Sequence, residues 1–245
     1  MPATVVIPAR LASTRFPEKI IASRTGRPLV QHVVDQVKLC KNVGEIIVAA
    51  DDRKIADALR QYDTHVVMTD PDHPSGTDRI AEVAASRKDS LIVNVQGDEP
   101  EIEPEVIDTL IERVTRTGEP MGTAATVFPA GADPINPNLV KVVLSTEGRA
   151  LYFSRSPIPF HRDSTEAREP PYYLHLGLYA YQCDFLLKYA SWSPTPLERA
   201  EKLEQLRALE HGVPIGVVVV KRATHGVDTK EQYDAFVARY LSKQT

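Results

Sequence analysis

Three cations stand close together near the N-terminus, in the segment Pro8–Lys19 (PARLASTRFPEK). Arg10, Arg15 and Lys19 are separated mostly by small and hydroxyl-bearing residues, which let backbone N–H groups approach a ligand closely. The segment follows an apolar run at residues 4–7, whose β-branched residues predict a strand. In an open α/β sheet, ligands bind at loops that leave the carboxyl ends of strands. Cations and accessible N–H groups at such a loop favour a polyanion, so the segment predicts a triphosphate site.

A basic loop exposed to solvent on an ordinary α/β protein is the alternative interpretation. The segment contains neither GxxxxGK[ST] nor GxGxxG, so the two commonest phosphate-binding motifs are absent from it. The net charge of −4 argues against general binding to nucleic acid or to an anionic membrane, which needs a basic surface. The charge therefore favours a local site, and other residues must decide between the two interpretations.

Two aspartates far apart in the sequence are candidates for completing such a site. Asp98 lies in the segment QGDEP (96–100), at the predicted carboxyl end of a strand and beside the place where the basic loop should emerge. Mg²⁺ prefers one or two carboxylates together with phosphate oxygens and water. Asp228 precedes a predicted helix, so it either caps that helix or joins Asp98 around one metal ion. For Asp98 the alternative is a turn with incidental acidic residues.

The periodicity of apolar residues places these segments in an α/β fold. Predicted strands at 4–7, 45–50, 65–68 and 90–96 alternate with predicted helices at 28–39, 51–62 and 77–87. This alternation indicates a doubly wound, mostly parallel sheet with right-handed crossovers. A helix at 103–116 and a strand at 122–127 follow.

Beyond Ala130 the alternation is lost. Strands are predicted at 139–144, 174–181 and 217–220, a polar loop or arm at 157–171, and helices at 195–211 and 230–240. The helix at 195–211 begins with a capping box and proline at its first position. We therefore expect a mixed sheet in an inserted α+β subdomain. No signal peptide or run of about 18 apolar residues is present, which predicts a cytoplasmic protein without membrane insertion.

Polar residues in this second part are candidates for a substrate site. Arg155 is the one basic residue of the apolar run LYFSR, and its fork could hold a carboxylate; a surface arginine is the alternative. His175 and Tyr179 project from one face of a predicted strand, where a core role is the alternative. Glu204 and Gln205 flank an apolar helix face and point either to solvent or into a cleft.

Eight segments, taken together, resemble the 3-deoxy-manno-octulosonate (Kdo) cytidylyltransferases, the CMP-Kdo synthetase family. They are PARLASTRFPEK, SGTDR (75–79), VNVQGDEP (93–100), LVKVV (139–143), LYFSR (151–155), HLGLYAY (175–181), LEQLR (203–207) and GVDT (226–229). The resemblance covers essentially the whole chain in order. Related sialic-acid cytidylyltransferases share the style of the N-terminal loop but not QGDEP combined with HLG…Y and LEQLR.

The resemblance implies a nucleotidyltransferase that joins CTP to Kdo and releases pyrophosphate, for lipopolysaccharide core synthesis. It implies catalytic roles for Arg10, Arg15, Lys19 and Asp98, and Mg²⁺ bound by Asp98 and Asp228. The implied nucleotide-binding residues are Pro8, Ala9, Arg10, Leu11, Ala12, Ser13, Arg15, Lys19, Ser75 and Gly76. Those implied for the sugar acid are Gln96, Arg155, His175, Tyr179, Glu204 and Gln205.

The resemblance further implies how the single domain is organised. A nucleotide-binding core is expected at about 1–130 and 212–245, and a sugar-binding and dimerisation subdomain of a homodimer at about 131–211. Two alternatives stay open. One is a cytidylyltransferase for a related acid, such as 8-amino-Kdo or a nonulosonate; the other is a catalytically silent nucleotide-binding protein.

Overall fold

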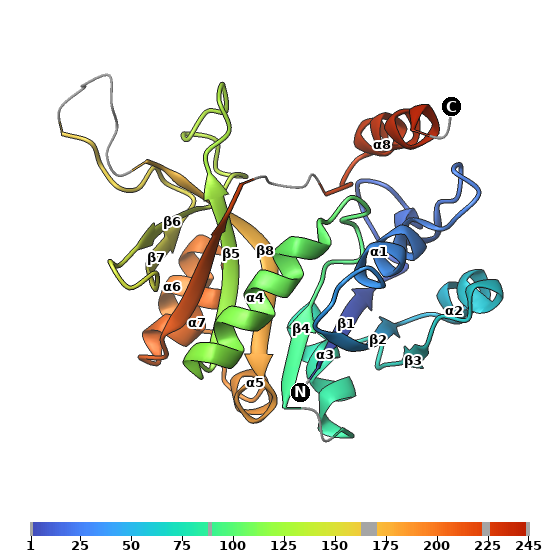
Figure 1. The fold of residues 1–245 in the computed structure, drawn as a ribbon, viewed down its shortest axis with the longest axis horizontal. Helices are drawn as coiled ribbons and strands as arrows, with labels where there is room; N and C mark the ends of the chain where they lie inside the picture. Colours follow the sequence, from blue (N-terminus) through green and yellow to red (C-terminus); the bar gives the residue numbers. More distant parts are fainter. Residues whose placement is uncertain (1, 88–89, 163–170, 222–225, 244–245) are drawn as a thin grey trace. The chain divides into compact units, whose positions relative to one another are not determined.

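The computed structural model describes residues 2–87, 90–162, 171–221 and 226–243 (Figure 1). The chain forms two compact units, one made of Met1–Asp108 with Thr224–Thr245 and the other of Thr109–Ala223. The second unit is larger than the predicted subdomain at about 131–211, because the strand Met121–Val127 pairs with both Tyr173–Gln182 and Ile215–Val220. The roles predicted for the two parts stay predictions.

The first unit contains a fully parallel sheet. Its strands are β1 (Ala3–Ala9), β2 (Val43–Ala50), β3 (Val66–Met68) and β4 (Leu91–Asn94), in the order β3-β2-β1-β4. All seven residues of β1 are buried, as expected for a central strand covered on both faces. The doubly wound parallel core is thereby confirmed, and the carboxyl end of β1 lies between the ends of its two neighbours (Figure 1).

Helices follow these strands in the predicted places. They are α1 (Leu29–Val37), α2 (Arg53–Leu59) with η2 (Arg60–Tyr62), α3 (Gly76–Ala85) and α8 (Lys230–Ser242), while α4 (Pro104–Thr117) crosses the boundary between the units. The 3₁₀ turn η1 (Lys19–Ile21), at the end of the basic loop, was not predicted. The last helix, drawn in red in Figure 1, packs against α1 through a cluster that contains Leu29, Val227, Tyr233 and Phe236. No helix in the described ranges is long and apolar enough to cross a bilayer.

The second unit contains a mixed sheet, as predicted. Its strands are β5 (Met121–Val127), β6 (Lys141–Leu144), β7 (Ala150–Ser154), β8 (Tyr173–Gln182) and β9 (Ile215–Val220). β5 is antiparallel to β8 and parallel to β9, whereas β6 is antiparallel to both β7 and β8. Strand β7 and helix α5 (Cys183–Ala190) were not predicted. Most of the predicted arm, residues 163–170, lies outside the described residues.

The single helix predicted at 195–211 is wrong. The chain forms α6 (Pro196–Glu201) and α7 (Gln205–Glu210), separated by a break at Lys202, whose φ of 54° is left-handed. Arg155 gives the physical reason, because its guanidinium donates to the carbonyls of Glu201 at 2.6 Å and Lys202 at 3.2 Å. A continuous helix would use these two carbonyls for its own main-chain hydrogen bonds. The predicted start is correct, since the Glu198 carboxylate accepts the N–H of Thr195 at 3.1 Å.

Candidate active site

Lys19 lies between the two aspartates predicted to bind metal. Its Nζ donates to Asp98 Oδ2 at 2.6 Å, to the carbonyl of Val227 at 2.9 Å and to Asp228 Oδ1 at 3.1 Å. The Lys19 side chain is 13% exposed, and those of Asp98 and Asp228 are 30% and 44% exposed. The fold of the first unit therefore gathers two acids distant in sequence around one ammonium group and leaves both carboxylates open to solvent.

The loop after β4 lies tightly against the first strand. A Cβ on Gly97 would lie 2.9 Å from the carbonyl oxygen of Pro8 and 2.9 Å from Cδ1 of Ile20, closer than real Cβ atoms approach. The next residue along, Asp98, accepts the N–H of Val227 through its main-chain oxygen at 2.8 Å. Glycine is thus required at position 97 by close approach, and one main-chain bond attaches the C-terminal segment to the same loop.

Asp228 is not the cap of α8. Thr229 holds that position, because its hydroxyl accepts the N–H of Gln232 at 3.3 Å while the Gln232 side chain accepts the N–H groups of both Thr229 and Asp228. The carboxylate of Asp228 is left to pair with Lys19 and with Nη2 of Arg15 at 2.9 Å. Sequence reasoning left a helix cap and a metal ligand open for Asp228; the structure excludes the cap, and the metal role stays a prediction.

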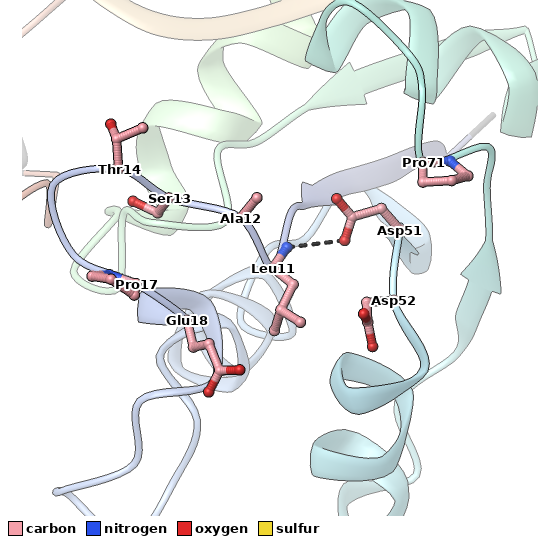
Figure 2. Close-up of a pocket in the computed structure, with 9 residues that line it drawn as sticks. All are labelled: Leu11, Ala12, Ser13, Thr14, Pro17, Glu18, Asp51, Asp52 and Pro71. Atoms are coloured by element: carbon pink, nitrogen blue, oxygen red, sulfur yellow. Dashed lines mark hydrogen bonds between the residues drawn. The ribbon is translucent and has the colours of Figure 1, made fainter.

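The basic loop is held at both ends. At its start, the N–H of Leu11 donates to Oδ1 of Asp51 at 2.9 Å (Figure 2). Toward its end, Phe16 packs on the ring of Tyr233 with 5.3 Å between centroids. Glu18 then adopts a left-handed φ of 55°, which turns the chain into η1 and directs Lys19 toward the acids.

The loop carries exposed cations and hydroxyls: Arg10 directly precedes the first anchor, and Ser13 and Arg15 lie between the two. Arg10 is exposed directly after β1, the side chain of Arg15 is 64% exposed, and Ser13 is half-buried. In this region Arg15 and Lys19 balance the charges of two aspartates, and Arg10 adds a further positive charge. An anion such as a triphosphate is therefore favoured here over a cationic ligand.

A cavity of about 590 Å³ borders the other side of the loop (Figure 2). It is lined by Leu11, Ala12, Ser13, Thr14, Pro17, Glu18, Asp51, Asp52 and Pro71. Its three carboxylates disfavour a triphosphate by charge repulsion. The charge therefore favours the face that carries Arg15 and Lys19 for the predicted triphosphate, whose position stays a prediction.

Ser75 and Gly76, predicted near the nucleotide base, lie beside Pro8. A Cβ on Gly76 would be 3.5 Å from Cγ of Pro8, an ordinary contact. Ser75 caps α3, because its hydroxyl accepts the N–H of Asp78 at 3.2 Å and donates to the Asp78 carboxylate at 2.6 Å. The predicted residues are thus brought together, and their contact with a base stays a prediction.

Arg155, predicted to clamp the sugar carboxylate, is strongly engaged with the main chain. Its guanidinium donates to the carbonyls of Glu201, Pro137 and Lys202 at 2.6, 2.8 and 3.2 Å. Its own N–H donates to the Glu201 carboxylate at 2.9 Å, and its carbonyl accepts from Nζ of Lys141. A guanidinium has five N–H donors, so three such bonds leave two for a carboxylate. That Arg155 binds the carboxylate of the sugar acid stays a prediction, and its bonds to three carbonyls also give it a structural role.

His175 and Tyr179 lie together on β8. Their ring centroids are 5.5 Å apart, and Nε2 of His175 is 3.0 Å from the hydroxyl of Thr123. Burial lowers the pKa of His175 to about 3 and raises the pKa of Tyr179 well above its ordinary value. Both side chains are therefore neutral near pH 7, which suits hydrogen bonding to hydroxyls and excludes His175 as a general base with an ordinary pKa.

The remaining predicted residues differ in burial. Gln205 is buried, and its Nε2 has no hydrogen-bond partner among the described residues. Glu204 is partly buried and accepts a bond from the Tyr189 hydroxyl through its main-chain oxygen at 2.6 Å. Gln96 belongs to the first unit, where its Nε2 is 3.5 Å from Oδ1 of Asn94. Whether these residues contact a sugar acid stays a prediction.

Sequence reasoning missed the residues that hold the predicted ones in place. Asp51 was placed only at the start of a predicted helix, although it anchors the basic loop. Lys141 is fully buried and donates to the carbonyls of Asn136, Leu139 and Arg155; a lysine inside the apolar run LVKVV was the available signal. Glu201 carried no signal, because an acid in the last turn of a helix is ordinarily solvated.

The two aspartates fit a magnesium ion. Both carboxylate oxygens contact the same ammonium group, so they can be no farther apart than the sum of those two distances. In the described ranges no three His, Cys, Asp or Glu residues gather into a metal site. Mg²⁺ needs no such cluster, because phosphate oxygens and water supply most of its ligands beside one or two carboxylates.

Known proteins match this chain over nearly its full length. A family model described as cytidylyltransferase matches residues 4–217. A 3-deoxy-manno-octulosonate cytidylyltransferase from Geobacter metallireducens is 47% identical, with 98% of each chain covered. One of the same name from Herminiimonas arsenicoxydans is 50% identical, over 98% of this chain and 99% of that one. The chain belongs to the 3-deoxy-manno-octulosonate cytidylyltransferase family.

Solved structures agree with this family. CMP:2-keto-3-deoxy-manno-octonic acid synthetase complexed with CTP matches with a TM-score of 0.94 and 37% identity, over 99% of this chain and 100% of that one. A putative glucose-1-phosphate thymidylyltransferase from Bacillus anthracis, 14% identical with a TM-score of 0.69, shares the fold. The resemblance noted in the sequence, the α/β fold class and the assignment as a nucleotidyltransferase are thereby confirmed.

Proposed function

We propose that this enzyme transfers the cytidylyl group of CTP to Kdo, giving CMP-Kdo and pyrophosphate. The observation that carries the proposal is the junction of Lys19 with Asp98 and Asp228 at the end of the basic loop. Support comes from the relatives, which are named for this activity, and from the solved structure, which is described as a CTP complex.

The cations act on the phosphates. Arg10, Arg15 and Lys19 project from one loop whose anchors at Leu11 and Phe16 fix it before the ligand arrives. Nucleotidyl transfer depends mainly on positioning and on neutralising charge, with little covalent work for the protein. The cations hold the triphosphate and then the leaving pyrophosphate, and the Ser13 hydroxyl donates a hydrogen bond. The attacking group is the anomeric hydroxyl of Kdo, so no protein nucleophile takes part.

Asp98 and Asp228 are the residues that would hold Mg²⁺. When bound, this ion polarises the α-phosphate and lowers the pKa of the attacking hydroxyl. Lys19, which here donates to both carboxylates, would then donate to phosphate oxygens, so that its charge stays paired. The close packing of Gly97 on Pro8 fixes where Asp98 points.

The sugar acid is assigned to polar side chains of the second unit, and the role of Gln96 in the first unit stays a prediction from the sequence. Arg155 would hold its carboxylate with the donors that do not bind the main chain. His175, Tyr179, Glu204 and Gln205 would meet its hydroxyls; the neutral state of the histidine and tyrosine suits them to uncharged partners. We further propose a homodimer, a cytoplasmic location and a role in lipopolysaccharide core synthesis.

Release of pyrophosphate from CTP and Kdo with Mg²⁺ tests the proposal. CTP, UTP and ATP are compared in parallel, and 8-amino-Kdo and a nonulosonate replace Kdo in further arms. The proposal expects CTP and Kdo to give the highest kcat/KM and Lys19→Met to abolish turnover. Preference for 8-amino-Kdo or a nonulosonate would reassign the acceptor, and no pyrophosphate from any pair would refute the transferase activity.

A further inference from the structure

Arg79, on α3, is a charged residue with no solvent exposure. Its Nη1 donates to the hydroxyl of Thr69, whereas Nε and Nη2 have no hydrogen-bond partner among the described residues. Burying a guanidinium with so few partners is costly, and natural proteins retain such groups mainly where they serve a purpose. The segment SGTDR was noted in the sequence for its first two residues, and the role of its arginine was not considered.

The charge closest to Arg79 is the carboxylate of Asp51. Nη2 lies 3.8 Å from Oδ2 of Asp51, whose side chain is only 11% exposed. The other carboxylate oxygen, Oδ1, accepts the N–H of Leu11 in the bond drawn in Figure 2. The main-chain N–H of Asp51 donates to the carbonyl of Ala9 at 3.3 Å. Asp51 therefore links the buried guanidinium to the point where the basic loop leaves β1.

The charges around Arg79 belong to the same loop. Burial lowers the pKa of Arg79, Asp51 raises it, and the charge of Arg10 lowers it again. A guanidinium remains protonated despite such shifts, so a fixed positive charge lies beneath the loop. Without it, the nearly buried carboxylate of Asp51 would lose its neighbouring counter-charge and turn toward solvent, and Leu11 would lose its acceptor.

We infer that Arg79 is a positioning residue for the nucleotide: it fixes Asp51, which holds Leu11 and thereby orders the loop that binds the triphosphate. The inference rests on the proposed function and adds that the affinity for CTP depends on the charge of Arg79. Arg79 itself touches no substrate, because its side chain is fully enclosed. Its removal should weaken the binding of CTP and leave the binding of Kdo unchanged, since the predicted sugar residues lie on other elements.

The experiment measures the Kd for CTP by calorimetry without Kdo, and the KM for Kdo at saturating CTP. Arg79→Met removes the charge with little change of volume, Asp51→Asn removes the opposite charge, and Arg79→Lys retains a cation. We expect the Kd for CTP to rise about tenfold in Arg79→Met, the factor that one lost hydrogen bond corresponds to. Asp51→Asn should show a similar rise, and the double variant should be no weaker than either single one, because both act through one contact. Arg79→Lys should recover part of the affinity.

Arg87→Met is the matched control. Arg87 follows the same helix and pairs with Glu45, which lies near the opposite end of β2 and away from the basic loop. It should lower the melting temperature without changing the Kd for CTP. If Arg79→Met fails to fold, Asp51→Asn decides the question, because it keeps the shape of the side chain.

Three results would overturn the inference. They are a wild-type Kd for CTP in both Arg79→Met and Asp51→Asn, an equal loss of CTP and Kdo binding, and additive losses in the double variant. Each of these leaves the wild-type enzyme active and so leaves the proposed function standing. Wild-type protein that binds no CTP would refute the proposed function, and with it the role of Arg79.

Discussion

Gly97→Ala is the substitution whose effect follows most directly from the geometry of the site. The new methyl carbon would lie 2.9 Å from the carbonyl oxygen of Pro8, about 0.5 Å inside ordinary van der Waals contact. The Ile20 methyl group on its other side can rotate away, but the Pro8 carbonyl belongs to a central strand and cannot. The loop that carries Asp98 must therefore retreat by roughly that 0.5 Å.

Overpacking of this size costs about 2 kcal/mol of unfolding free energy, which corresponds to a fall in melting temperature of roughly 4–8 °C for a chain of this length. Because reacting groups tolerate little displacement, we expect kcat to fall about tenfold with a smaller change in the KM for Kdo. Thermal unfolding and initial rates of pyrophosphate release measure the two effects.

Gly226→Ala is the matched control, since it faces the same loop from the C-terminal segment. Its methyl carbon would lie 3.8 Å from the carbonyl of Asp98 and 3.8 Å from Cγ of Glu99, which are ordinary contacts. It should leave both the melting temperature and kcat near wild type. A Gly97→Ala enzyme with wild-type kcat and stability would show that the loop is not fixed by this contact.

Five further substitutions test the site and its surroundings. Asp98→Asn should fold normally and lose at least about 100-fold in kcat, because it removes a partly exposed charge that is proposed to bind Mg²⁺. Asp228→Asn should raise the Mg²⁺ concentration that the reaction needs. A near-normal rate at saturating Mg²⁺ would remove Asp98 from this role. Arg155→Ala should raise the KM for Kdo and lower the free energy of unfolding by roughly 3 kcal/mol, whereas Lys141→Met should lower stability alone. An unchanged KM for Kdo in Arg155→Ala would reject the clamp. His175→Asn should flatten the pH dependence of stability: its folded pKa of about 3 lies below the unfolded value, so the wild type loses stability as pH falls from about 6.5 to 3, by about 2–3 kcal/mol at pH 4.5. An equal acid sensitivity in wild type and variant would contradict the shift.

Local pattern was enough to predict the first unit. Runs of consecutive apolar, mostly β-branched residues predicted β1 and β2. Parallel strands that are covered on both faces show such runs in place of alternating polar and apolar residues. The carboxyl ends of such strands meet at one edge, so Asp98 could be placed beside the basic loop before any coordinates were known.

The second unit depends on contacts that local pattern does not encode. The break at Lys202 follows from the guanidinium of Arg155, which directly follows β7 and lies 47 positions earlier in the sequence. It donates to the carbonyls at the end of α6. In strand β7 the apolar residues do not alternate with polar ones: Leu151 is apolar although it is 62% exposed. The sequence of β7 therefore lacks the pattern that would distinguish a half-buried strand from a loop.

Asp228 shows a related limit of local reasoning. An aspartate before a helix is usually its cap, and only the neighbouring Thr229 with Gln232 shows that another residue serves that purpose. The partners of Asp228, Arg15 and Lys19, come from the opposite end of the chain, where no spacing rule could connect them.

The ammonium group of Lys19 lies between both acids and neutralises part of their charge. A divalent ion that bound alone would have to displace this internal counter-ion and would gain few protein ligands in return. An ion that bound together with a nucleotide would bring phosphate oxygens able to accept from the lysine. The metal binding proposed above would therefore be ordered, with Mg²⁺ binding together with CTP and not before it.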